Sequence, residues 1–145
     1  MEKMWNQNLI LAKYHHSVCE RLFENFKNYE TKRFLSATIK EASISLMHLI
    51  NSLLIYHKSK EKINLRKKPL ENFKKIANKY YPQRLIDNLM ILIKVEKDQK
   101  GSPIEILQGD KILYLIGGEY KTLTYERLKE LLDSLNKVIK TFPKD

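Results

Sequence analysis

The chain is poor in the residues that crosslink or interrupt structure. Its 145 residues contain one cysteine, Cys19, together with only four glycines and four prolines. A lone thiol cannot form an intramolecular disulfide, which fits a reducing compartment. So few Gly and Pro residues leave little room for long irregular segments. The apolar fraction of 43% is typical of a folded protein, and the length fits a single domain spanning residues 1–145.

Long apolar runs are also lacking. The densest stretch, residues 44–56, is interrupted by Ser45, His48, Asn51 and Ser52, whereas a membrane-spanning helix needs roughly 18 consecutive apolar residues. The first residues, MEKMWNQNLI, do not combine a basic region, an apolar run and a cleavage site. We therefore expect a cytoplasmic protein with no membrane partner.

Apolar periodicity predicts a helical bundle over residues 6–97. The expected helices are residues 6–27, 32–58, a third beginning at Pro69 and ending near Pro82, and 84–97. The side chains expected to point inward are Leu11, Val18, Leu22 and Phe26 in the first helix, Phe73, Ala77 and Tyr80 in the third, and Leu85, Leu89 and either Leu92 or Ile93 in the fourth.

The pattern changes after Gly101-Ser102-Pro103. Short apolar segments predict strands over residues 104–107, 112–116 and 120–123, with turns at Gly109-Asp110 and Gly117-Gly118. Thr124 is a suitable N-cap for a last helix over residues 125–141, whose apolar stripe runs from Leu128 to Phe142. The predicted fold is mainly α: an up-and-down bundle of four to five helices, with a β-hairpin or three-stranded meander (residues 103–123) before a C-terminal helix (residues 124–142).

Positive charge is concentrated in residues 58–84, which we call the basic segment. It contains ten basic and two acidic residues, and so carries +8 of the net charge of +10. Such a field attracts anions, above all nucleic acid or a nucleotide. The candidate phosphate contacts are Lys58, Lys60, Lys62, Arg66, Lys67, Lys68, Lys74, Lys75 and Arg84. Phe73, Tyr80 and Tyr81 could stack on bases; the alternative is a solvated lysine-rich surface with Phe73 and Tyr80 in the core.

Residues suited to catalysis or metal binding are few. His48 and His57 are possible functional histidines, but their separation of nine helical positions turns them to opposite faces, so they cannot share an ion. His16 and Glu20 form a helix pair that could bind a metal only with a third ligand, so we expect a solvated pair. Cys19 is expected to be a structural thiol. No phosphate loop, dinucleotide fingerprint or zinc-type spacing is present. We therefore predict no catalytic residue, metal or cofactor.

The first two predicted helices resemble the HEPN superfamily, the higher eukaryote and prokaryote nucleotide-binding domains. The likeness lies in AKYHHSVCERLFENFKNYETKRFLSATIKEASISLMHLINSLLIYH, where a polar turn joins a helix to a long Ala/Ser-containing helix, and it covers roughly residues 8–97. It implies a small helical bundle, often dimeric, of the kind found in toxin–antitoxin pairs and RNA-related systems. The enzymatic members carry an arginine followed four to six residues later by a histidine. No such pair occurs here, so the resemblance implies a non-catalytic member.

Three functions follow as hypotheses. The first is a non-enzymatic module that binds nucleic acid or a nucleotide through the basic segment. The second is a protein-interaction or oligomerisation module, such as a toxin–antitoxin partner or a homodimer. Small residues on the apolar second helix are expected to let neighbouring helices pack closely, and such helices also build dimer interfaces. The third, a divergent ribonuclease using His48 or His57, depends on the family resemblance alone.

Overall fold

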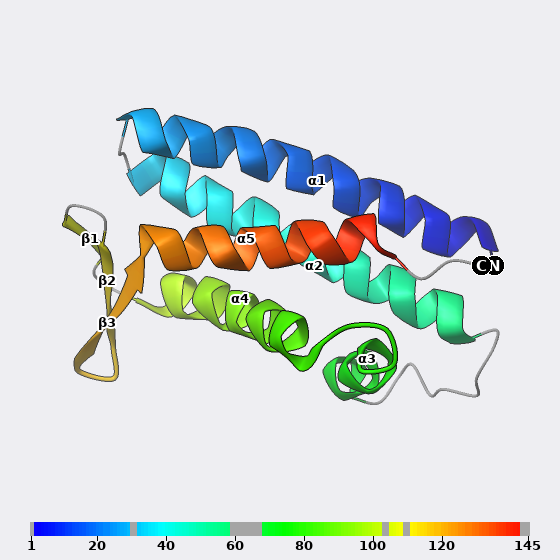
Figure 1. Cartoon of the computed structure of the whole chain (residues 1–145). Coiled ribbons are helices and arrows are strands. Elements are labelled where there is room, and N and C mark those ends of the chain that lie inside the picture. Colours follow the sequence, from blue (N-terminus) through cyan, green and yellow to red (C-terminus); the bar gives the residue numbers. More distant parts are fainter. Residues whose placement is uncertain (1, 30–31, 59–67, 103–104, 109–110, 143–145) are drawn as a thin grey trace.

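The computed structural model describes residues 2–29, 32–58, 68–102, 105–108 and 111–142. Its elements are five helices and three strands: α1 (Glu2–Tyr29), α2 (Lys32–Lys58), α3 (Pro69–Ala77), α4 (Gln83–Gly101), β1 (Glu105–Gln108), β2 (Lys111–Ile116), β3 (Glu119–Thr124) and α5 (Tyr125–Lys140). The four long helices lie side by side, with the sheet at one end of the bundle and α3 at the other (Figure 1). The predicted mainly α bundle with a small meander before the last helix is confirmed.

The helices α1 and α2 form an antiparallel hairpin held by polar bonds at seven-residue intervals. The hydroxyls of Ser52 and Ser45 donate to the carbonyls of Trp5 and Ala12 at 2.5 and 2.6 Å, and the thiol of Cys19 donates to that of Thr38 at 3.4 Å. A repeat of seven is the one at which two helices stay in contact along their length. The small side chains of α2 therefore allow close packing and also satisfy their own polar groups.

The three strands form an antiparallel sheet in the order β1-β2-β3. The turn between β2 and β3 is made by Gly117 and Gly118, whose φ angles of 57° and 81° are the left-handed values that glycine adopts most easily. The predicted Gly109-Asp110 turn lies outside the described residues. Ile112 and Tyr114 of β2 are buried, and β2 and β3 contact α4 and α5. The meander therefore covers one end of the bundle core.

The last helix follows its prediction closely. Thr124 caps α5 by accepting the backbone N–H of Arg127 at 3.1 Å, and the apolar stripe is buried throughout: Leu128, Leu131, Leu132, Leu135, Val138, Ile139 and Phe142. Three other predicted helices are shorter or longer than those found. α1 begins at Glu2 rather than residue 6, α4 spans Gln83–Gly101 rather than 84–97, and α3 already ends at Ala77.

Two side chains expected in the core lie at the surface instead. Leu11 is 41% exposed, because α1 buries the face of Leu9 and Ala12 and turns Leu11 outward. Tyr80 is 46% exposed, since it lies in the turn after α3, and the neighbouring Tyr81 is the buried residue. No helix within the described residues has the length and apolar character needed to cross a membrane.

Candidate nucleic-acid interface

The described part of the basic segment surrounds α3. Lys58 ends α2, Lys68 immediately precedes α3, and Arg84 stands in the first turn of α4. All three are exposed. The candidate contacts Lys60, Lys62, Arg66 and Lys67 lie outside the described residues. We use the name basic surface for the described group of Lys58, Lys68, Lys74, Lys75 and Arg84.

The amphipathic pattern of α3 decides which way its lysines face. Phe73, Ile76 and Ala77 are buried, so Lys74 and Lys75 point to solvent. Neither lysine forms an ion pair with a described residue, whereas Lys68 lies 3.7 Å from Glu71. Both partners of that pair are well exposed, so it neutralises little of the local field. The outer face of α3 therefore presents uncompensated positive charge.

The aromatic residues of the segment have separate roles. Phe73 is fully buried, and Tyr81 is buried with its hydroxyl donating to the carbonyls of Val138 and Thr141 at 3.4 and 3.2 Å. Burial raises the pKa of Tyr81, because the phenolate would lose its solvation. Of the three candidate stacking residues, Tyr80 alone exposes much of its ring. The expectation that Phe73 and Tyr81 could stack on bases is therefore wrong.

His57 is a structural residue in this fold. It is 1% exposed, its Nδ1 lies 3.1 Å from the carbonyl oxygen of Leu53, and its Nε2 lies 2.6 Å from the hydroxyl of Tyr80. A carbonyl can only accept, so Nδ1 carries the proton and the Tyr80 hydroxyl donates to Nε2 in the neutral ring. His57 thus ties the end of α2 to the turn after α3 and orients the exposed tyrosine.

His48 faces a different neighbour. Its Nδ1 lies 3.1 Å from Oδ1 of Asn8 on α1, and its ring stacks on that of His15. Partial burial, together with the nearby His15, lowers the pKa of His48. The two histidines named from the sequence therefore contact different elements, as their helical spacing predicted. Nothing in the sequence favoured His15 as a functional residue, because its stacking partner His48 lies 33 residues away in the chain.

The remaining predicted sites are structural. Cys19 is fully buried, and burial raises the pKa of its thiol to about 12. His16 is also buried, which corrects the expectation of a solvated pair: only its partner Glu20, 3.4 Å away, is exposed. Burial is the main cause that lowers the pKa of His16, against the opposing charge of Glu20.

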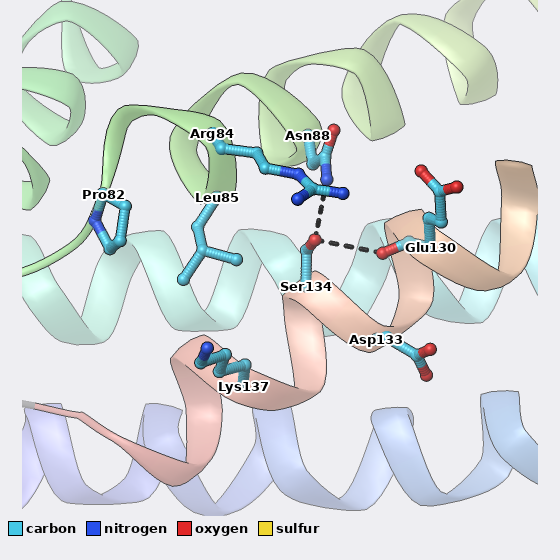
Figure 2. Close-up of a pocket in the computed structure, with 8 residues that line it drawn as sticks. All are labelled: Pro82, Arg84, Leu85, Asn88, Glu130, Asp133, Ser134 and Lys137. Atoms are coloured by element: carbon cyan, nitrogen blue, oxygen red, sulfur yellow. Dashed lines mark hydrogen bonds between the residues drawn. The ribbon is translucent and has the colours of Figure 1, made fainter.

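A pocket of about 450 Å³ lies between α4 and α5, next to the basic surface. Figure 2 shows its lining residues: Pro82, Arg84, Leu85, Asn88, Glu130, Asp133, Ser134 and Lys137. Asn88 donates to Ser134 at 2.9 Å, and its carbonyl oxygen accepts from Arg127 at 3.0 Å. The charges of two cations and two carboxylates in the lining cancel, so the pocket adds little to the positive field. Arg84 belongs to both the pocket and the basic surface.

Comparisons with known proteins give no neighbour: no family model, no curated protein and no solved structure matches this chain.

Proposed function

We propose that the protein is a non-enzymatic module that binds nucleic acid through the basic surface and the adjoining lysine-rich part of the basic segment. The observation that carries the proposal is the concentration of charge: residues 58–84 hold +8 of the net +10. Backbone phosphates attract such a surface whatever the base sequence, because each neutralised phosphate releases condensed counterions. Membership of the HEPN superfamily, as a non-catalytic member, is part of this proposal and remains a prediction.

The folded arrangement supports this use of the charge in two ways. Lys74 and Lys75 leave α3 on its solvent face without a described ion-pair partner, so their charge is free to act on a ligand. Tyr80 lies in the turn after the same helix with its hydroxyl fixed by His57, so an exposed ring is held in place within the basic segment. Cations next to an oriented aromatic ring are the usual elements of a single-strand binding surface.

Fluorescence anisotropy with labelled single-stranded RNA and duplex DNA tests the proposal at low and moderate salt. We expect affinity that falls steeply with salt, and at least tenfold weaker binding by Lys74→Glu/Lys75→Glu at low salt, because two positive charges become negative, a net change of four units. A matched control is Lys121→Glu/Lys129→Glu, which makes the same charge change on exposed residues of β3 and α5. If both variants lose affinity equally, the loss follows from net charge alone, and the basic surface is rejected as the binding site.

A protein-interaction module is the second candidate. It is favoured by an exposed apolar row on α1, made by Met4, Leu11 and Tyr14, which are 52%, 41% and 60% exposed. The same anisotropy experiment separates the two candidates. If wild-type protein binds neither nucleic acid at low salt, the basic surface is a solvated or protein-docking face, and the apolar row becomes the leading site.

A further inference from the structure

The pocket between α4 and α5 has no net charge, but its charged groups are separated along its length. Lys137 lies in the last turn of α5, on the side of the pocket that carries Pro82, the residue before α4. The carboxylates of Asp133 and Glu130 lie four and seven residues earlier on α5, and Figure 2 shows them on the other side of Ser134. Four and seven residues of helix correspond to about 6 and 10 Å along the axis. The pocket therefore has a cationic end and an acidic end.

Three of the four charged groups in the lining are available to a ligand. Arg84, Asp133 and Lys137 are exposed, and their side chains form no ion pair or hydrogen bond with another described residue. Glu130, in contrast, already lies 2.8 Å from Arg127. The groups that meet a ligand first are therefore Lys137 at the cationic end, Asp133 at the acidic end, and Arg84 on the α4 side.

The buried residues of the pocket hold one another in place. Nδ2 of Asn88 donates to the hydroxyl of Ser134 at 2.9 Å, and that hydroxyl donates to the backbone carbonyl of Glu130 at 3.0 Å. Pro82 and Leu85 add apolar surface to the lining. The volume of about 450 Å³ is within the range of small-molecule sites. The pocket thus combines a fixed interior and apolar surface with charged ends whose spacing is on the scale of a flat organic ring system.

We propose that this pocket receives one unpaired base of a nucleic-acid strand held on the basic surface, and that it prefers guanine. The inference rests on the proposed function and adds a base specificity to it. Arg84 belongs to both the pocket and the basic surface, so a phosphate bound by Arg84 places the attached base beside the pocket. In a duplex the Watson–Crick edge of that base is engaged by its complement, and we therefore expect a single strand to be preferred.

Guanine is the base whose polarity matches that of the pocket. Its O6 and N7 are neighbouring acceptors, and its N1–H and N2 amino group are neighbouring donors. The ammonium of Lys137 only donates and the carboxylate of Asp133 only accepts, so each suits one of these two edges. Adenine and cytosine each offer a carboxylate one amino group beside an acceptor, and uracil offers one N–H between two acceptors. Guanine is therefore expected to make the largest number of hydrogen bonds in the pocket.

Fluorescence anisotropy with a labelled oligouridine RNA, in which one central uridine is replaced in turn by each other base or by inosine, tests the preference. We expect the guanine strand to bind about tenfold more tightly than the all-uridine strand. Inosine, which lacks the N2 amino group, is expected to lie between them. Asp133→Ala is expected to abolish the preference, whereas Glu126→Ala, the same charge change at another exposed position of α5, is expected to keep it. The ratio of affinities is the readout, because both variants strengthen binding of every strand by losing a negative charge.

A second measurement does not depend on strand binding. In ¹H–¹⁵N spectra of the wild-type protein, guanosine monophosphate is expected to shift the side-chain amide signals of Asn88 more than uridine monophosphate does. Equal affinity for all bases, or a guanine preference that Asp133→Ala retains, would overturn the inference and leave the proposed function intact. If no strand binds, the proposed function fails, and equal shifts with the two nucleotides would then reject the pocket as well.

Discussion

Two pairs of antiparallel helices, α1–α2 and α4–α5, differ in the polar bonds that are buried between them. Between α1 and α2, buried small side chains donate to backbone carbonyls of the opposite helix, as Ser45 does to Ala12 at 2.6 Å, and among the described residues side-chain pairs occur only where the contact is partly exposed. Between α4 and α5 the bonds run from side chain to side chain, where Asn88 links Ser134 to Arg127. The first pair brings its backbones close; the second keeps room beside the contact for the pocket of Figure 2.

The difference shows how each pair responds to a change in side-chain size. A hydroxyl that reaches a carbonyl of the neighbouring helix requires the two backbones to be close, so added volume has nowhere to go. A side-chain network at the border of a pocket can relax into that space. We therefore expect α1–α2 to be sensitive to volume and α4–α5 to be sensitive to the loss of hydrogen-bonding groups.

The largest expected effect is that of Ser45→Leu. Ser45 is fully buried between α1 and α2, so the larger side chain must separate the helices. We expect the free energy of unfolding to fall by about 3 kcal/mol in urea denaturation. Ser45→Ala is the control: it removes one hydrogen bond without adding volume and is expected to cost about 1 kcal/mol. Equal losses in the two variants would show that the close packing is unimportant.

The next largest effect is expected from Asn88→Ala in the α4–α5 network. Asn88 is buried and bonded at both ends of its amide, so its removal should lower the free energy of unfolding by about 2 kcal/mol. A double-mutant cycle with Ser134→Ala, measured by urea denaturation, isolates their shared bond, and we expect a coupling of about 1 kcal/mol. Strict additivity of the two changes would mean that the bond contributes nothing to stability.

The features that could be predicted from the sequence are those that a local pattern of residues encodes. The small residues of α2, the N-cap Thr124 and the stripe of α5 are local patterns, and each indicated the structure that was found. The misplacement of Leu11 has a physical reason: the apolar residues of α1 cover more than one face, and only the position of α2 decides which face is buried. Periodicity alone could not supply that choice.

The candidate sites divide in the same way. The charge of the basic segment can be counted along the chain, so the exposure of its described part, the basic surface, was predictable. The pairing of His15 with Glu41 and with His48 depends on the register between α1 and α2. No local spacing encodes that register, and for this reason the sequence pointed to His48 but not to its partner.

The smallest perturbation is chemical labelling of the Cys19 thiol. The labelling rate reports opening of the α1–α2 pair and needs no substitution there. The pKa of this thiol is raised to about 12 by burial, whereas an unfolded cysteine has a pKa of about 8.5. At pH 8 the folded protein therefore holds almost no thiolate, and iodoacetamide labelling followed by mass spectrometry should find it unmodified until urea unfolds the chain. Ser45→Leu should accelerate labelling more than Asn88→Ala does, because it separates the pair that contains Cys19.

The raised pKa also predicts a direction for stability against pH. The thiol is neutral in the folded state, so its contribution is complete below about pH 8.5 and is lost as pH rises toward 12, where only the unfolded chain ionises readily. Buried tyrosines act in the same direction, and the comparison is therefore with Cys19→Ala, which should lose stability less steeply than wild type from pH 8.5 upward. Parallel curves for the two proteins, together with rapid labelling of native wild type, would mean that the α1–α2 contact opens freely and that its close packing is not what stabilises it.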